Sequence, residues 1–255
     1  MAVRIETDGR GVATLSLARP EKRNALDRAT IDALTEAARR LGADDGVRAV
    51  VLAGEGAAFC AGGDLDWMRA QMGASADERA EGARALAEML GALDALPKPL
   101  IGRIHGDAFG GGVGLACVCD VAVAGPGARF GLTETRLGLI PATIGPYVVA
   151  RLGPVARRVF MAPRTIGAEE AARLGIVARV AEDLSAAVEA EVAPYLLAAP
   201  GAVAAAKALA RRLAGAPGAA EVEATVAALV ARWETAEARE GIAAFFDRRP
   251  PPWAD

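Results

Sequence analysis

Two glycine-rich stretches and one glutamate are the residues of this chain whose types and spacing suggest chemistry. The first stretch is FCAGGDL at residues 59–65, the second is IHGDAFGGGVGL at residues 104–115, and Glu134 follows in the segment FGLTE. Glycines allow the main chain to approach a ligand closely and to adopt positive φ angles. The second stretch also precedes an expected short helix at residues 112–117, whose first turn would expose unpaired N–H groups. Two such loops and a carboxylate suit a reaction in which a carbonyl oxygen becomes negatively charged.

Each of these features also has a structural interpretation, which the residues alone leave open. The glycines could form turns that serve tight packing. Asp64 is expected to cap a helix at residues 65–72 whether or not the first loop binds a ligand. Glu134, taken alone, could be a surface or helix-capping glutamate, and His105 is expected to be a structural residue of a loop or strand end.

Several other chemistries lack the residues that they require. A Ser-His-Asp hydrolase is excluded because His105 is the only histidine and no G-x-S-x-G sequence occurs. The chain also has no Walker A loop and no G-x-G-x-x-G after a strand. Cys117 and Cys119 are too closely spaced for the usual zinc pairs. We expect no metal site, and we expect the three cysteines, Cys60 included, to be small buried hydrophobic residues in a reducing compartment.

The composition limits the partners and the location of the protein. The 255 residues are 53% hydrophobic and 24% charged with a net charge of −3, which allows a sizeable core and provides no basic field for nucleic acid. The first residues contain no apolar segment typical of a signal peptide, and no apolar run reaches the ~18 residues of a membrane span. We therefore expect a cytoplasmic protein that binds neither nucleic acid nor membranes.

Strands and helices alternate through the first part of the sequence. Strands are expected at residues 12–17, 47–53, 100–104 and 120–124. Asp27 is expected to cap a helix whose apolar residues recur at helical spacing, and residues 77–93 are expected to form an alanine-rich helix. This alternation predicts an α/β fold with a largely parallel sheet.

The last part of the sequence has a different pattern. Helices are expected at residues 182–198, 202–213 and 219–246, with no strand between them. We therefore divide the chain into an α/β core, residues 1–195, and a helical C-terminal region, residues 196–255. An all-helical region after an α/β core often lies across a neighbouring subunit.

Taken together, the glycine loops and the FGLTE segment resemble the crotonase (enoyl-CoA hydratase/isomerase) superfamily. The matching sequences are PEKRNAL at residues 20–26, FCAGGDL, GDAFGGGVGL with Cys119-Asp120, FGLTETRLGLIP at residues 130–141, residues 155–180, and EGIAAFF at residues 240–246 with Arg248-Arg249. The resemblance covers almost the whole chain. It implies a ββα superhelix (spiral) core, a C-terminal helical trimerisation region, and a homotrimer or homohexamer. It also implies that coenzyme A enters as part of the substrate and that no separate cofactor is needed.

The resemblance further implies roles for particular residues. The amides of Gly63 and Gly111 would form an oxyanion hole around an acyl-CoA thioester oxygen, and Glu134 would move the proton. The predicted CoA and substrate contacts are Arg23, Ala25, Ala61, Gly63, Asp64, Leu65, Gly111 and Gly114 and, from an adjacent subunit, Arg248 and Arg249. Arg23 could instead be a solvated surface cation, and the two C-terminal arginines could instead neutralise the end of a helix.

Position 114 departs from the pattern of typical hydratases in this superfamily. Those enzymes use two glutamates, and the first would stand where this chain has Gly114. Gly114 would remove a negative charge and open volume, so that an acyl group with its own carboxylate becomes easier to accommodate. The sequence LGLIPATIGPY at residues 137–147 resembles the branch that contains methylglutaconyl-CoA and isohexenylglutaconyl-CoA hydratases, and also the dehydratases of hydroxymethylglutaryl-type thioesters. The expected acyl-pocket residues are Trp67, Met68, Phe109, Leu137, Ile144 and Tyr147.

The expected reaction is the reversible addition of water to a 2-enoyl-CoA, such as 3-methylglutaconyl-CoA, by a hydro-lyase with one catalytic glutamate. A Δ3,Δ2-enoyl-CoA isomerase is an alternative, because one glutamate suffices to move a proton between carbons. A decarboxylase or dehydratase of the same superfamily is another alternative. A non-catalytic acyl-CoA or RNA-binding member is a further one, against which the acidic balance and the retained Glu134 argue.

Overall fold

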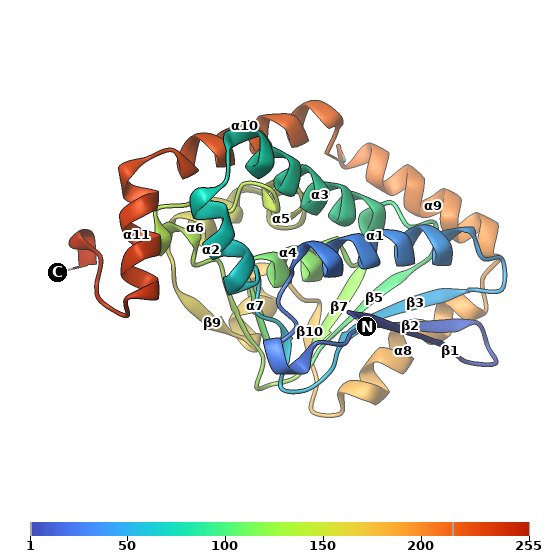
Figure 1. Ribbon diagram of the computed structural model, residues 1–255. Coiled ribbons are helices and arrows are strands. Elements are labelled where there is room, and N and C mark those ends of the chain that lie inside the picture. The colour runs from blue at the N-terminus through green and yellow to red at the C-terminus, as the bar shows by residue number, and fades with distance from the viewer. Residues whose placement is uncertain (1, 216, 255) are drawn as a thin grey trace.

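The computed structural model describes residues 2–215 and 217–254, and a six-stranded sheet forms its centre (Figure 1). The strands follow one another in the order β1-β2-β3-β5-β7-β10. Their bounds are Val3–Thr7 for β1, Val12–Leu17 for β2, Ala49–Gly54 for β3, Leu100–Ile104 for β5, Val121–Ala124 for β7 and Arg179–Val180 for β10. β1 is antiparallel to β2, and every other neighbouring pair is parallel. The predicted α/β fold with a largely parallel sheet is confirmed.

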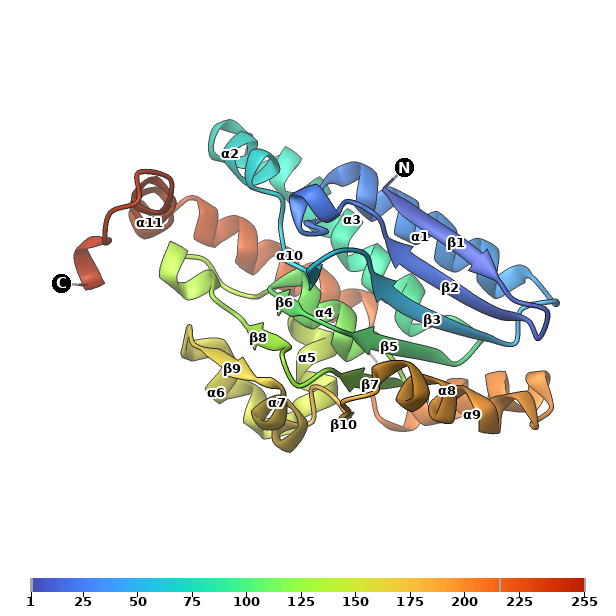
Figure 2. The same cartoon turned by 90° about the horizontal axis from the view of Figure 1, so that it is seen from below.

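A second, smaller sheet has the strand order β4-β6-β8-β9. Its strands are Ala58–Cys60 (β4), Asp107–Phe109 (β6), Arg129–Gly131 (β8) and Thr165–Gly167 (β9). Figure 2 shows β6 and β8 continuing beyond the ends of β5 and β7. β3, β5 and β7 are each followed by a short strand of the second sheet and then by helical structure, which is the ββα repeat that the resemblance implied. The second sheet itself was not predicted from the sequence.

Helices cover both faces of the six-stranded sheet (Figure 1). α1 (Arg28–Ala43), α3 (Ala76–Asp94) and α4 (Gly111–Val118) share a buried cluster with Val50 and Leu52 of β3. The alternate residue Val51 packs on the opposite face with α8 (Leu184–Leu196). Because β3 is buried on both faces, it consists of an unbroken apolar run instead of an alternating one.

The remaining helices connect the strands or form the C-terminal region. They are η1 (Pro20–Lys22), α2 (Leu65–Gly73), η2 (Glu134–Leu137), α5 (Gly145–Leu152), η3 (Gly153–Val155), α6 (Ala156–Met161), α7 (Ala168–Leu174), α9 (Pro200–Leu213), α10 (Ala219–Trp233), α11 (Ala236–Phe246) and η4 (Pro252–Ala254). Asp27 caps α1 and Asp64 caps α2, as predicted. The prediction of a single helix at residues 219–246 is wrong. α10 ends at Trp233, and Thr235 caps α11 because its hydroxyl oxygen accepts a hydrogen bond from the Ala238 amide.

The C-terminal helices contact the core of the same chain. α10 runs along α3, and Arg84 of α3 pairs with Glu223 of α10 (Figure 1). α11 packs against η2, the turn that contains Glu134. Within the described residues, no single helix has the length and apolar composition of a membrane span. α8 and α9 have this length and composition only when they are taken together, and the angle between them is 106°. The boundary near residue 195 and a trimer contact through this region remain predictions.

Candidate active site

The three segments that sequence analysis singled out begin at one edge of the second sheet. β4 leads into the first glycine loop, β6 into the second, and β8 into the segment with Glu134. β4, β6 and β8 are parallel neighbours, so their carboxyl ends lie side by side. The short sheet is therefore the element that brings together Gly63 and Glu134, which are 71 positions apart in the chain.

The first loop presents Gly63 with an unpaired amide. The Leu26 amide donates to the Gly62 carbonyl oxygen at 2.7 Å, and the Asp64 amide donates to the Leu26 carbonyl oxygen at 3.0 Å. These two bonds hold Gly63 as a single bridge residue beside Leu26. Among the described residues, the Gly63 N–H has no hydrogen-bond acceptor. It is therefore available to a ligand oxygen.

The second loop presents Gly111 in the same way. Gly110, with φ of +49°, is the N-cap of α4, and its amide donates to the Gly131 carbonyl oxygen at 3.0 Å. Gly111 is the first residue of the helix, where the amide has no carbonyl of a preceding turn to bond. The loops touch each other: a β-carbon at Gly62 would stand 2.9 Å from the Phe109 carbonyl oxygen. This close approach requires glycine at position 62.

Glu134 lies against the second loop. Its Oε1 is 3.1 Å from the place that a β-carbon of Gly110 would occupy. Its Oε2 is buried and has no hydrogen-bond partner within the described part of the chain. Burial raises the pKa of Glu134 to about 7, against the opposing effect of its own and the Thr133 main-chain N–H groups. A carboxyl group with this pKa can both accept and donate a proton near neutral pH.

A cavity of about 350 Å³ joins the two loops and Glu134. The predicted site residues that line it are Ala61, Gly63, Leu65, Trp67, Met68, Phe109, Gly111, Glu134, Leu137 and Ile144. The cavity is mostly apolar, as expected for an acyl chain, and the polar groups described above converge on it. The lining does not by itself test the catalytic or CoA-binding roles, which remain predictions.

Other residues of the cavity wall were missed. They include Arg79, Arg136, Thr143, Leu229, Trp233 and Phe245. Three of them, Leu229, Trp233 and Phe245, belong to α10 and α11. Tertiary packing brings these two helices over the cavity, and no local sequence motif predicts this contact. The Arg79 guanidinium lies over the Trp233 ring, 5.5 Å from its centroid, and pairs with Glu234. Thr143 falls within the quoted LGLIPATIGPY sequence, so that motif was the signal for it.

Two predictions about the acyl pocket are wrong. Tyr147 does not line the cavity, because it lies on the side of α5 that faces α3, where its hydroxyl donates to the Ala87 carbonyl oxygen at 3.2 Å. Gly114 does not open volume: a β-carbon there would stand 2.8 Å from Cγ2 of Ile144. The Ile144 side chain fills the space beside Gly114.

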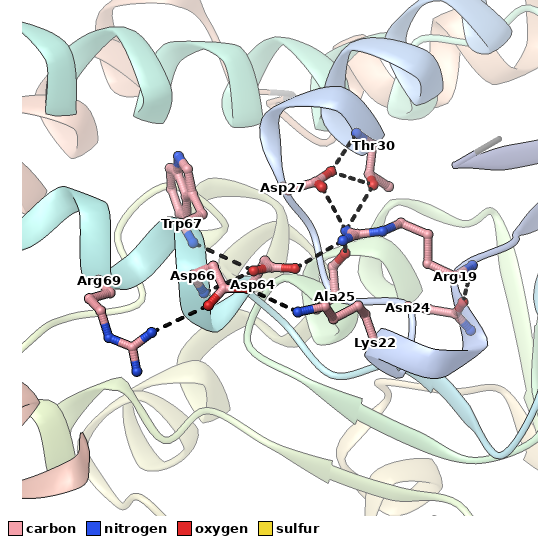
Figure 3. A network of polar contacts seen from close by, with 10 residues as sticks. All are labelled: Arg19, Lys22, Asn24, Ala25, Asp27, Thr30, Asp64, Asp66, Trp67 and Arg69. Carbon is pink, nitrogen blue, oxygen red and sulfur yellow. Dashed lines mark hydrogen bonds and ion pairs between the residues drawn. The ribbon is translucent and has the colours of Figure 1, made fainter. Parts of the chain in front are cut away.

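Asp64 and Ala25 belong to a polar network behind the first loop (Figure 3). The Asp64 carboxylate accepts from the Asp66 amide at 2.9 Å and pairs with Arg19 at 3.1 Å. The same guanidinium pairs with Asp27 at 2.8 Å and donates to the Ala25 carbonyl oxygen at 3.0 Å. The Asp64 side chain thus faces Arg19 and the start of α2 and does not line the cavity.

The predicted cationic contacts of CoA lie outside the cavity of this chain. Arg23 pairs with Asp107, which also pairs with Arg129. Arg249 pairs with Glu240 beyond the cavity wall, and Arg248 follows α11 with a positive φ of 56°. The structure therefore brings none of these three arginines to the cavity, and their contact with CoA remains a prediction.

The histidine and the cysteines occupy structural positions. Nε2 of His105 lies 2.8 Å from the Gly56 carbonyl oxygen in the turn before β6. Cys60, Cys117 and Cys119 are free and buried, and burial raises the pKa of each thiol to about 12. These cysteines are buried hydrophobic residues, as expected.

The chain belongs to the crotonase superfamily, since the sequence profile of the enoyl-CoA hydratase/isomerase family matches residues 7–255. A putative enoyl-CoA hydratase from Thermus thermophilus is 35% identical over 243 residues, which cover 94% of this chain and 96% of that protein. The crystal structure of a putative enoyl-CoA hydratase from Mycobacterium avium paratuberculosis is 34% identical, with a TM-score of 0.92 and full coverage of both chains.

Two further relatives show how far the similarity reaches. Pseudomonas aeruginosa AtuE is 36% identical, with a TM-score of 0.82 and full coverage of both chains. The enoyl-CoA hydratase ACTT6 of Alternaria alternata is 42% identical over 143 residues, which are 56% of this chain and 46% of that protein. The match thus spans about half the length of the Alternaria relative.

Proposed function

We propose that this protein is an enoyl-CoA hydratase that adds water reversibly to a 2-enoyl-CoA thioester. One observation carries the proposal: the unpaired amides of Gly63 and Gly111 and the buried carboxyl group of Glu134 line the same cavity. The family to which the chain belongs and the names of its relatives support this reaction.

The proposed mechanism uses the two loops for charge and Glu134 for the proton. The thioester oxygen accepts hydrogen bonds from Gly63 and Gly111, which stabilise the enolate that forms when water adds at C3. Each such donor is worth ~2.7–4 kcal/mol in the transition state. The Glu134 carboxylate takes a proton from the water, and the resulting carboxylic acid gives a proton to C2. Dehydration follows the same path in reverse.

We propose a branched or carboxylated acyl group, with 3-methylglutaconyl-CoA as the example. Gly114 opens no volume for such an acyl group, but the charges of the cavity support this substrate. Within residues 2–215 and 217–254, Glu134 is the one carboxylate that lines the cavity, whereas Arg79 and Arg136 are cations of its wall. Arg79 is paired with Glu234, while the Arg136 guanidinium bonds to no described residue. Arg136 is therefore the proposed partner of an acyl carboxylate.

The ratio of kcat/KM for 3-methylglutaconyl-CoA and crotonyl-CoA tests this substrate. We expect the carboxylated substrate to be preferred, and Arg136→Leu to reduce its kcat/KM about tenfold while changing that of crotonyl-CoA little. Arg158→Leu, on the exposed surface of α6, serves as the matched control. A strong preference for crotonyl-CoA contradicts the substrate proposal but leaves the hydratase proposal intact.

A Δ3,Δ2-enoyl-CoA isomerase is the second candidate, because the cavity wall holds one carboxylate in the described structure and one suffices to carry a proton between two carbons. The conjugated enoyl thioester absorbs in the ultraviolet. Hydration of a 2-enoyl-CoA lowers this absorbance, and isomerisation of a 3-enoyl-CoA raises it. Isomerisation without hydration contradicts the hydratase proposal.

The same panel of thioesters tests whether the protein is a decarboxylase or a dehydratase. Binding of a thioester without turnover favours a non-catalytic acyl-CoA protein.

We also propose a homotrimer or homohexamer. Apolar side chains are exposed on the helices that surround the core, among them Val149, Val155, Met161, Leu197 and Leu213. Burial of such side chains against a second copy would stabilise an oligomer. Light scattering on the purified protein gives its mass, and a monomer contradicts the proposal.

A further inference from the structure

The cavity contains a second buried oxygen that lacks a partner. Of the described side chains that line it, two place a buried polar atom without a hydrogen bond: Glu134 through Oε2 and Thr143 through Oγ1. Thr143 is 4% exposed. A buried hydroxyl group without a partner is costly, so a polar group of a ligand or a water is expected to bond it.

The position of Thr143 follows from that of its neighbour. Ile144 fills the space beside Gly114, where typical hydratases of this superfamily would have their first glutamate. The turn that directs Ile144 into this space also brings Thr143 to the cavity wall. The cavity therefore lacks one carboxylate and has a threonine hydroxyl next to the side chain that replaces it.

We propose that the Thr143 hydroxyl positions the attacking water, an inference that rests on the hydratase function proposed above. The hydroxyl oxygen accepts one hydrogen bond from the water, and the Glu134 carboxylate accepts the other. Both water hydrogens are then held, and a lone pair of the water oxygen faces C3. As the C3–O bond forms, the water proton passes to Glu134 and from there a proton goes to C2; Thr143 neither gains nor loses a proton.

Thr143→Val tests the proposal, because valine retains the branched shape and removes the hydroxyl. Hydration is measured with crotonyl-CoA and 3-methylglutaconyl-CoA. A second assay follows exchange of the C2 hydrogens of butyryl-CoA in D₂O, which needs Glu134 and the oxyanion hole but no attacking water. We expect the variant to lose about tenfold in kcat for hydration, with KM within about twofold and exchange within about threefold of wild type.

Two further variants separate positioning from packing. Thr143→Ser retains a hydroxyl, and we expect it to hydrate within about threefold of wild type. Thr135→Val removes another buried, unpartnered hydroxyl, one residue from Glu134 but absent from the cavity wall, and should affect neither assay.

Each outcome decides for or against the proposal. A selective loss of hydration in Thr143→Val, restored by serine, supports it. Equal losses in hydration and exchange overturn it, since Thr143 would then act through Glu134 or the fold. Unchanged hydration also overturns it and leaves the hydratase function standing. A wild-type protein that exchanges C2 hydrogens but hydrates neither substrate overturns both proposals.

Discussion

The polar network behind the first glycine loop and the cavity in front of it differ in whether their buried polar groups have hydrogen-bond partners. In the network, Asp64 is buried but pairs with Arg19 and caps α2 (Figure 3). In the cavity, Glu134 and Thr143 keep buried oxygens without partners. Folding alone favours the first arrangement, because an unpartnered buried group costs stability. From this contrast we expect the network to hold the loop in place and the unpartnered oxygens to bond a ligand or a water.

The largest expected effect comes from neutralising the unpartnered carboxyl group. We expect Glu134→Gln to lower kcat for hydration by about 10²–10⁴-fold, the usual contribution of a general acid or base, with little change in KM. Steady-state kinetics with the best thioester measure this. Asp27→Asn makes the same chemical change in the paired network, where asparagine still caps α1, and should retain activity. Equal activity of Glu134→Gln and wild type removes Glu134 from the mechanism.

The pH dependence of hydration is a second test of the role of Glu134. Only the ionised carboxyl group of Glu134 can accept a proton from water, and its pKa is raised to about 7 by burial. We therefore expect wild-type kcat/KM for hydration to rise with pH and to level off above about pH 7. A profile already flat from pH 5 upward contradicts the assignment.

The next effect concerns the loop amides. Gly111→Pro removes one N–H at the first position of a helix, where proline fits the backbone. We expect kcat to fall about 10²–10³-fold in a folded protein, as for other lost oxyanion-hole donors. Gly111→Ala is the matched control, because its β-carbon meets the same obstacle, Cδ1 of Leu26 at 2.7 Å, but the N–H remains. Near wild-type turnover in a folded proline variant, or equal losses in both variants, contradicts the role of this amide.

How far the sequence predicts this molecule depends on whether an element is long or short. β3 and β7 were predicted because a strand buried on both faces is an apolar run that stands out in the sequence. β4, β6 and β8 were missed, because three residues carry no measurable periodicity, yet their edge assembles the site. The glycine loops and Glu134 were found through motif order, which does not require those strands to be seen.

The errors within the site arose from contacts between distant residues. Tyr147 was placed in the acyl pocket by its closeness in sequence to Ile144, but Ile144 is the N-cap of α5, whereas Tyr147 lies within the helix and donates its hydroxyl to the Ala87 carbonyl oxygen of α3. The space beside Gly114 depends on the Ile144 side chain, 30 positions away, and no pattern around Gly114 shows it. Asp64 has a hydrogen-bond partner and Glu134 Oε2 has none, and this difference likewise depends on contacts between residues that are distant in the sequence.

Glu134→Gln should also change stability, in the direction opposite to its effect on activity. The pKa of Glu134 is raised from 4.5 to about 7 in the folded protein, so ionisation costs folding free energy as the pH rises through this range. Below about pH 4 the carboxyl group is neutral in both states and the cost vanishes. Above pH 7 we expect Glu134→Gln to be more stable than wild type by up to about 3 kcal/mol. Denaturant unfolding of both proteins at pH 4 and pH 8 measures this difference. If the difference in stability between Glu134→Gln and wild type is the same at both pH values, the raised pKa is contradicted.

The smallest expected effect lies in the paired network and has the opposite sign. Asp64→Ala removes the cap of α2 and one of two carboxylates that hold Arg19, and we expect it to lower the free energy of unfolding by about 2 kcal/mol. Asp64→Asn keeps the cap and loses only the charge, so it should fall between alanine and wild type. Lys22→Ala breaks a solvent-exposed pair with Asp66 and should leave the unfolding midpoint unchanged. If Asp64→Ala instead stabilised the protein, as Glu134→Gln should at pH 8, the two carboxylates would not differ in kind, and a missing partner would no longer distinguish a functional group from a structural one.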